Sequence, residues 1–193
     1  INQLNNGWIE CPQWKITTNN SLHNFTALCI TLQVPLNWDI IDDINNTDPE
    51  TIDYYITNIF SAHHTPNNRN GNGAFWMLEG GPGGSGESLY PIAIPWMNFL
   101  DDTFDIYIPD HRGTGESNPL NCGLLNTPQC AKLLDDIYGD KLHYFSTYQA
   151  SIDLGYVIHL FQTNLSVYNN RNDIIWGGSY GTYYLNTYLN LFP

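Results

Sequence analysis

The chain has 193 residues and a mass of 22.0 kDa, which fits a single domain with a hydrophobic core of its own. Hydrophobic residues make up 42% of it and charged residues 13%, so the composition excludes an intrinsically disordered protein. Lys and Arg together number 6 and Asp and Glu 19, and the net charge of -13 argues against nucleic acid or an anionic membrane as a partner. The sequence also contains no apolar run of about 18 residues, the length that a membrane-spanning helix needs.

The first half of the chain predicts strands with no helix between them. Residues 26–36 form a largely apolar run, and residues 51–60 alternate in part and are rich in Tyr, Ile and Thr, as strands are. The acidic, Asn-rich segment 39–50 and the turn cluster 65–73 predict loops. These early strands predict an antiparallel start to a sheet.

The second half alternates between strands and helices. Three short apolar runs bounded by turn signals predict strands buried on both faces, namely 74–78 (AFWML), 104–109 (FDIYIP) and 173–176 (DIIW). Three segments of helical length accompany them, at 87–100, 147–165 and 179–191. This alternation predicts an α/β fold with a doubly wound, mostly parallel sheet.

The most informative motif is G-x-S-x-G at residues 177–181, between the last predicted strand and the last predicted helix. Strand, turn and helix are the context in which this motif forms a nucleophile elbow. Gly177, Gly178 and Gly181 remove side chains from a strained turn, and Ser179 is expected to project at the carboxyl end of the sheet. The sequence therefore predicts Ser179 as a catalytic nucleophile, and the alternative is a glycine-rich turn without chemistry.

A glycine-rich loop, GGPGGSG at 80–86, directly follows the strand at 74–78. Gly80 and Gly83 let backbone N–H groups approach a reacting carbonyl closely, and Pro82 stiffens the loop. In nucleophile-elbow enzymes one oxyanion N–H comes from the residue after the serine, here Tyr180, and the second comes from this loop. A phosphate-binding loop is the alternative, and the missing G-K-[ST] ending argues against it.

A third motif, DHRGTGES at 110–117, completes a resemblance to a known family. LEGGPGGSGES, YIPDHRGTGES and GGSYGTYYLNTYLNLFP, in this order, resemble the prolyl aminopeptidase and tripeptidyl aminopeptidase family of α/β-hydrolases. CITLQVPLNWD resembles an early segment of the tripeptidyl branch, and TYQASIDLGYVIHLF resembles the helix before the nucleophile strand. The resemblance covers most of residues 11–193.

The resemblance implies a serine peptidase that removes amino acids or tripeptides from the free N-terminus of a peptide, through an acyl-enzyme and without a cofactor. It implies Ser179 as the nucleophile, with Gly81 and Tyr180 supplying the oxyanion N–H groups. The family often has His or Asn where this chain has Glu79. We expect Glu79 either to contact the substrate amine or to cap a backbone N–H of the loop.

The DHRGTGES motif is predicted to be structural rather than catalytic. We expect Arg112 to pair with Asp110 or with Asp153 and to lock the loop after the strand at 104–109. No spacing of His, Cys, Asp or Glu predicts a metal site.

A serine nucleophile needs a base, and in this fold the order along the chain is Ser, then Asp or Glu, then His. Residues 180–193 contain none of these acids or bases. We therefore expect residues 1–193 to be the N-terminal portion of one α/β-hydrolase domain. A C-terminal segment or chain of the same precursor would supply the lid, Asp and His, and would contact 173–176 and 179–191. His111 is the alternative base within the chain.

The cysteines and sequons indicate a compartment. Four cysteines allow three pairings, of which we favour the short-range Cys11–Cys29 and Cys122–Cys130, with free buried thiols as the alternative. Four N-x-[ST] sequons are glycosylation candidates, at Asn19, Asn24, Asn45 and Asn164. Together with the acidity, they predict a secreted or lysosomal glycoprotein whose signal peptide has been removed.

Two other functions stay open at this point. An esterase or lipase-like hydrolase would keep the fold and change the substrate. A non-catalytic, glycosylated fragment with a binding role would keep the fold without the chemistry.

Overall fold

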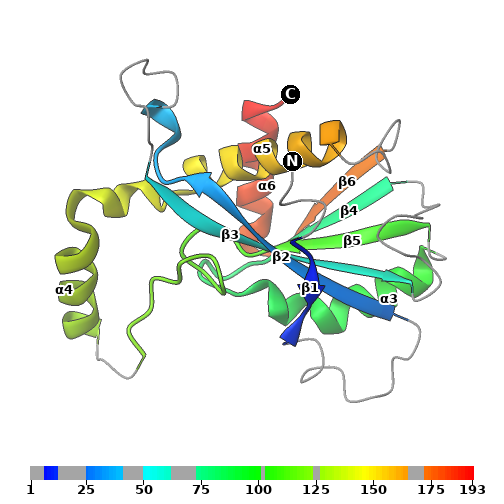
Figure 1. The fold of residues 1–193 in the computed structure, drawn as a ribbon, viewed down its shortest axis with the longest axis horizontal. Helices are drawn as coiled ribbons and strands as arrows, with labels where there is room; N and C mark the ends of the chain where they lie inside the picture. Colours follow the sequence, from blue (N-terminus) through cyan, green and yellow to red (C-terminus); the bar gives the residue numbers. More distant parts are fainter. Residues whose placement is uncertain are drawn as a thin grey trace.

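The computed structural model describes residues 7–12, 25–40, 50–61, 73–100, 103–123, 127–164 and 172–193. In this part of the chain one sheet lies between helices on its two faces (Figure 1). None of the helices described there is long and apolar enough to cross a membrane.

The sheet contains six described strands in the order β1-β2-β3-β5-β4-β6. Their bounds are Ile9–Glu10 (β1), Phe25–Pro35 (β2), Thr51–Ser61 (β3), Gly73–Leu78 (β4), Phe104–Pro109 (β5) and Asn172–Gly177 (β6). The strands β1, β2, β3 and β5 pair antiparallel in turn, whereas β4 lies parallel between β5 and β6. The predicted antiparallel start is therefore present, and the parallel pairing is confined to β4, β5 and β6.

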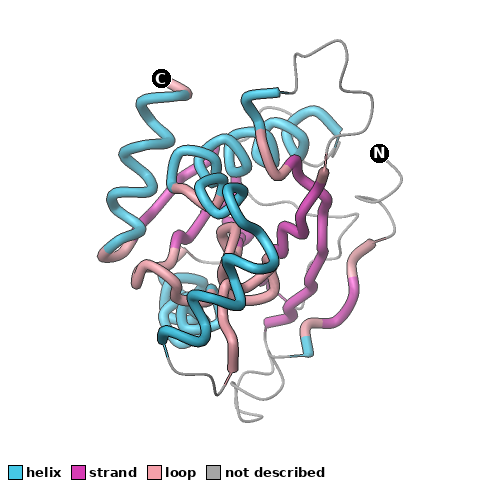
Figure 2. The backbone as a smooth tube through the Cα atoms, turned by 90° about the vertical axis from the view of Figure 1, so that its left-hand side faces the viewer, coloured by secondary structure: helices cyan, strands magenta, loops and turns pink. Residues whose placement is uncertain are grey.

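Three helices pack on the sheet, as the alternating pattern predicts. They are α3 (Tyr90–Phe99), α5 (Thr147–Asn164) and α6 (Tyr180–Leu191). Helix α3 covers one face, and α5 and α6 cover the other (Figure 1). Figure 2 shows that α6 and β1 lie at opposite sides of the molecule, in agreement with the strand order.

Shorter elements connect these layers. Three are 3₁₀ helices, η1 (Trp38–Ile40), η2 (Gly86–Leu89) and η3 (Gly139–Tyr144). The predicted helix at 87–100 divides into η2 and α3, because Ser85 caps η2 and Pro91 suits the first turn of an α-helix. Helix α4 (Thr127–Tyr138) was not predicted from the sequence. It has no buried residue and extends away from the sheet (Figure 1).

The core explains why the sheet carries helices on both faces. Every residue of β4 is buried, as expected for a strand covered on both sides. Trp76 stacks on Tyr107 with ring centroids 4.8 Å apart and also contacts Phe161 of α5. On the opposite face, Phe75 stacks on Trp96 of α3 at 5.2 Å.

Both predicted disulfides are present. Cys11–Cys29 joins the segment after β1 to β2, and Cys122–Cys130 joins a loop to α4. The candidate glycosylation sites Asn19, Asn24 and Asn45 lie outside the described residues, and Asn164 is the last residue of α5.

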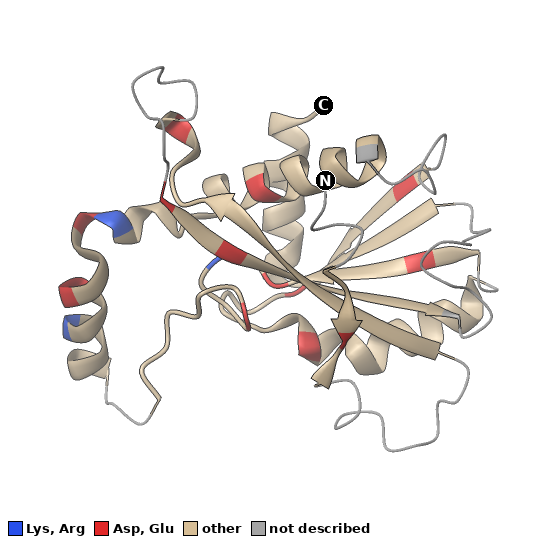
Figure 3. Ribbon diagram, viewed as in Figure 1, with Lys and Arg blue, Asp and Glu red and all other residues tan. Residues whose placement is uncertain are grey.

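The acidic side chains are distributed over several elements and do not gather on one of them (Figure 3). Some of them face Lys residues: Lys132 contacts Asp136 within α4, and Lys141 of η3 contacts Glu50 at 2.6 Å. Exposed ion pairs of this kind contribute little stability. In the described part of the chain, the net negative charge therefore marks no single docking surface.

Candidate active site

Ser179 occupies a tight turn between β6 and α6. Strand β6 ends at Gly177 and helix α6 begins at Tyr180, so the chain reverses direction over Gly178 and Ser179. Ser179 has φ 53° and ψ -121°, a backbone conformation that residues with a Cβ rarely adopt, and the residue is exposed. Such a conformation costs about 1–3 kcal/mol and persists only where the surroundings hold it.

Close backbone contacts hold this turn and require glycine at two positions. A Cβ on Gly177 would lie 2.2 Å from the carbonyl oxygen of Gly181, and one on Gly181 would lie 2.3 Å from that of Leu78. The Gly178 N–H donates to the Leu78 carbonyl at 3.3 Å, and the Gly181 N–H donates to the Gly178 carbonyl at 2.7 Å. The elbow is therefore packed against the end of β4.

The glycine-rich loop after β4 lies directly beside Ser179. A Cβ on Gly80 would come within 2.9 Å of Ser179 Cβ and 3.4 Å of Ser179 Oγ. The loop turns back on itself where the Gly84 N–H donates to the Gly80 carbonyl at 3.3 Å. Its middle residues are exposed, with a cis peptide bond between Gly81 and Pro82.

Two backbone N–H groups at this point have no acceptor within the described residues, those of Gly81 and Tyr180. They are the two groups that the sequence predicts for an oxyanion hole. Gly81 has φ 123° and Gly83 has φ 106°, conformations that favour glycine and let the loop present its backbone. The Tyr180 N–H belongs to the first turn of α6, where N–H groups lack intrahelical partners.

Glu79 caps the start of the loop. Its Oε1 accepts a hydrogen bond from the Gly80 N–H at 2.6 Å, and its Oε2 accepts one from the Ser88 hydroxyl. Of the two roles that the sequence allows for Glu79, these contacts correspond to the capping of a backbone N–H. A contact with a substrate amine stays a prediction.

Arg112 pairs with Asp153 and not with Asp110, so one of its two predicted partners is excluded. Its Nε donates to Asp153 Oδ2 at 2.8 Å and its Nη2 donates to Oδ1 at 2.7 Å, and both side chains are fully buried. The remaining donors bind the carbonyl oxygens of Leu36, Tyr144 and Pro35 at 2.6–3.0 Å. A guanidinium has five N–H groups, and here all of them are used to hold the loop after β5.

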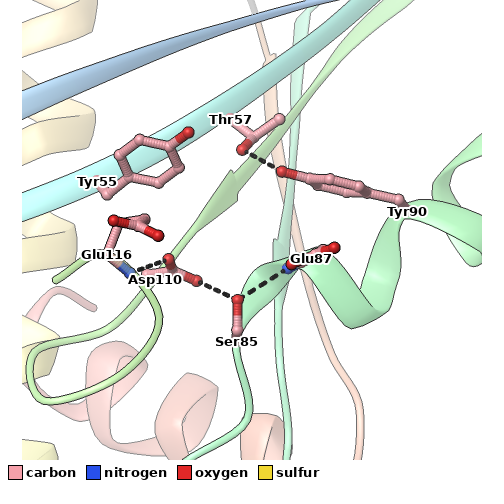
Figure 4. Close-up of a pocket in the computed structure, with 7 residues that line it drawn as sticks. All are labelled: Tyr55, Thr57, Ser85, Glu87, Tyr90, Asp110 and Glu116. Atoms are coloured by element: carbon pink, nitrogen blue, oxygen red, sulfur yellow. Dashed lines mark hydrogen bonds between the residues drawn. The ribbon is translucent and has the colours of Figure 1, made fainter. Parts of the chain in front are cut away.

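Asp110 joins that loop to the glycine-rich loop. Its Oδ1 accepts from the Gly86 N–H at 2.6 Å, and its Oδ2 accepts from the Glu116 N–H at 2.8 Å. Asp110 also lines a cavity of about 20 Å³ (Figure 4), together with six residues: Tyr55, Thr57, Ser85, Glu87, Tyr90 and Glu116. Burial raises the pKa of Tyr90 to about 12 and also raises the pKa of Asp110.

His111 lies beneath the elbow helix and makes no hydrogen bond to Ser179. Its Nδ1 donates to the Arg112 carbonyl at 2.9 Å, and its ring lies 5.7 Å from the ring of Tyr180 and 5.9 Å from that of Tyr184. Its Nε2 is buried and has no partner within the described residues. Burial and the Arg112 charge lower the pKa of His111, whereas the Nδ1 hydrogen bond opposes them.

The other two histidines that the structure describes give no base beside Ser179 either. His143 contacts the Asp140 carbonyl, and His159 is exposed on α5. The remaining three, His23, His63 and His64, lie outside the described residues. Within the described ranges, no group of three or more His, Cys, Asp or Glu side chains could hold a metal ion.

Sequence reasoning missed one contact that supports the elbow. Thr147 Oγ1 and the Tyr180 hydroxyl are hydrogen-bonded at 2.6 Å, which ties the start of α5 to the start of α6. The two residues are 33 positions apart, and no local pattern signals such a pair.

Comparison with solved structures identifies the fold. The peroxisomal α/β-hydrolase Lpx1 from Saccharomyces cerevisiae aligns with 89% of this chain at a TM-score of 0.54 and 16% sequence identity. The chain has the α/β-hydrolase fold. It spans 42% of the length of Lpx1, so the likeness to this α/β-hydrolase concerns less than half of that protein.

The other comparisons do not show a family for this chain. A cold-adapted esterase from an Arctic intertidal metagenomic library aligns with 89% of this chain and 58% of its own, at a TM-score of 0.47 and 16% identity. No family model and no curated protein matches the sequence. Membership of the aminopeptidase family therefore stays a prediction for this α/β-hydrolase fold.

Proposed function

We propose that Ser179 is the nucleophile of a serine hydrolase and that the N–H groups of Gly81 and Tyr180 form its oxyanion hole. We further propose that it is an aminopeptidase that releases amino acids or tripeptides from free peptide N-termini. The observation that carries the hydrolase proposal is Ser179 itself, an exposed serine with positive φ at the start of a helix. It lies so close to Gly80 that a Cβ on that glycine would come within 2.9 Å of Ser179 Cβ. A serine that was buried, or that had an ordinary negative φ, would not support a role as a nucleophile.

The proposed reaction passes through an acyl-enzyme. Ser179 Oγ attacks the carbonyl carbon of the scissile bond while a base takes its proton, and the base then gives that proton to the leaving amine. The N–H groups of Gly81 and Tyr180 stabilise the negative charge on the carbonyl oxygen, and each such donor contributes about 3–4 kcal/mol to lowering the barrier. Water then releases the acyl group from Ser179.

The base and its orienting acid are proposed to come from polypeptide outside these 193 residues, in the same precursor. Two observations support this. His111 holds its Nδ1 on a carbonyl and packs against tyrosine rings, and no hydrogen bond links it to the serine. Strand β6, moreover, is the last strand of the described sheet and pairs there with β4 alone.

The surface around β6 fits a further polypeptide. Apolar side chains are exposed on this strand, on α6 and directly after α6: Ile174 (40%), Tyr183 (59%), Leu189 (53%) and Phe192 (40%). An edge strand with apolar neighbours readily pairs with another strand. We propose that the segment carrying the acid and the base docks here.

A secreted or lysosomal location is also proposed, because both disulfides require an oxidising compartment.

The substrate class is tested on the whole protein with matched amides. An aminoacyl amide with a free α-amine and the same amide with an acetylated amine differ only in the charged group. The proposal predicts turnover of the free amine and a loss of at least about tenfold with the acetylated form, since a peptide N-terminus is bound through its charge. Equal turnover would leave a serine hydrolase and exclude the aminopeptidase, and turnover of esters alone would identify an esterase.

A further inference from the structure

One carboxylate connects the two loops that follow β4 and β5. Asp110 comes directly after β5 and is only 4% exposed. Its Oδ1 accepts from the Gly86 N–H at 2.6 Å. It also accepts, more weakly, from the Ser85 hydroxyl at 3.4 Å, while its Oδ2 accepts from the Glu116 N–H at 2.8 Å (Figure 4). Hydrogen bonds to a charged group are stronger than those between neutral groups, so this carboxylate is a strong link between the two loops.

The chain leaves space for this carboxylate on both sides. A Cβ on Gly115 would lie 1.9 Å from Asp110 Oδ2, and Gly115 has φ 49°. A Cβ on Gly86 would lie 2.6 Å from Ile108 Cγ2 and 3.2 Å from Asp110 Oδ1. The backbone of Asp110 is fixed as well, because its N–H donates to the Tyr55 carbonyl at 2.9 Å.

The contacts of Asp110 reach the oxyanion loop from its far end. Gly86 closes the glycine-rich segment and begins η2, and Ser88 of η2 donates to Glu79, which caps the Gly80 N–H. The loop is thus held at its start by Glu79 and at its end by Asp110. The exposed Gly81 lies between these two anchors.

We propose that Asp110 is a positioning residue that fixes the direction of the Gly81 N–H by anchoring Ser85 and Gly86 to the loop after β5. This inference rests on the proposed function, because it assigns the Gly81 N–H to the oxyanion hole. Asp110 itself makes no side-chain hydrogen bond to Ser179: its partners are Ser85, Gly86 and Glu116.

The test compares Asp110→Asn with Glu116→Gln in the whole protein. An amide offers one oxygen, so Asp110→Asn places an NH₂ group against either the Gly86 or the Glu116 N–H. Glu116→Gln removes a negative charge from the same cavity and keeps the backbone N–H that Asp110 binds. The two variants therefore separate the anchor from the local charge.

Two readouts are measured on each variant. Amide hydrogen exchange of the peptide 80–86 is expected to become about 10- to 100-fold faster in Asp110→Asn, the ratio that corresponds to one lost charged hydrogen bond, and to change little in Glu116→Gln. On an active wild type, kcat is expected to fall about 10- to 100-fold in Asp110→Asn with KM within about twofold, because a misplaced donor affects the transition state.

The outcomes separate this inference from the proposed function. Unchanged exchange in Asp110→Asn overturns the anchor, and faster exchange with unchanged kcat overturns its link to the oxyanion hole. A wild-type protein without hydrolase activity overturns the proposed function, and the exchange result still decides whether Asp110 holds the loop. If Asp110→Asn does not fold, Ser85→Ala removes the weaker bond to Asp110 together with the cap of the Glu87 N–H. Faster exchange in 80–86 is expected there too, and unchanged exchange overturns the anchor.

Discussion

The loops after β4 and β5 follow neighbouring parallel strands and are built in opposite ways. The loop after β4 is exposed at Gly81, and its backbone donor has no acceptor in the described chain. The loop after β5 contains Arg112, a fully buried cation whose donors are all bound within the protein. The first loop leaves a backbone donor exposed, whereas the second uses its polar groups to hold the shape of the loop.

This difference separates effects on stability from effects on catalysis. Substitutions in the loop after β5 should change the free energy of unfolding, and substitutions in the loop after β4 should change kcat. Asp110 follows β5 and is hydrogen-bonded to the end of the loop after β4, so its substitution should change both the free energy of unfolding and kcat. Three variants test this division.

The largest effect is expected for Arg112→Met. The substitution leaves Asp153 buried with its Trp38 hydrogen bond and no counter-charge, and breaking a buried ion pair in this way costs about 3–5 kcal/mol. Urea unfolding of the whole protein measures this loss. The kcat of the folded fraction should stay within about twofold of wild type.

Arg112→Met together with Asp153→Leu is the control, because it removes the unpaired carboxylate. The double variant should recover part of the lost stability, although the carbonyl oxygens of Leu36, Tyr144 and Pro35 keep no donor from residue 112. An Arg112→Met protein as stable as wild type would contradict the structural role of this loop.

A smaller effect, on kcat rather than on the free energy of unfolding, is expected for Gly80→Ala. The added methyl group would lie 2.9 Å from Ser179 Cβ and 3.0 Å from the Gly178 carbonyl, so the loop must move away from the serine. A shift of about 1 Å in a catalytic group lowers the rate roughly 100-fold. Steady-state kinetics should show a lower kcat with an unfolding midpoint near that of wild type. An unaltered kcat would mean that this loop does not act on the reacting carbonyl.

The smallest effect concerns pH and His111. Burial lowers the pKa of His111 in the folded protein, so the unfolded chain binds its proton first as the pH falls below about 6.5. Stability is therefore present above that pH and is lost as the pH falls towards the lowered pKa, by up to about 1.4 kcal/mol per pH unit. His111→Asn retains a donor for the Arg112 carbonyl and removes this titration.

Denaturant unfolding at several pH values between about 5 and 8 measures the difference. The free energy of unfolding of the wild type should fall more steeply with decreasing pH than that of His111→Asn. Parallel curves for the two proteins would show that His111 titrates equally in the folded and unfolded states.

The elements that were predicted correctly are those whose structure depends on residues close together in the sequence. The strands β4, β5 and β6 are short apolar runs, and the elbow is a glycine turn whose close contacts involve residues within a few positions or at the end of β4. Local composition therefore carries most of the information about the fold and about Ser179.

The contacts that the sequence left open join distant segments. The choice between Asp110 and Asp153 as the partner of Arg112 depends on where α5 lies, 41 residues further along the chain. The bond from Asp110 to the Gly86 N–H spans 24 residues and involves a backbone group, which no side-chain pattern signals. Helix α4 is different: its apolar residues have a local amphipathic spacing, from which the sequence alone could have predicted a helix.

The measurement that tests the central proposal most directly is covalent labelling by a fluorophosphonate, followed by peptide mass spectrometry. The probe reacts only with an activated serine, so the whole protein should carry one adduct on Ser179. Ser179→Ala should carry none, and Thr187→Ala, which removes a hydroxyl bonded to the Tyr183 carbonyl on the same helix, should label as wild type does. An adduct on another residue, or labelling of residues 1–193 alone that His111→Ala abolishes, would contradict the account.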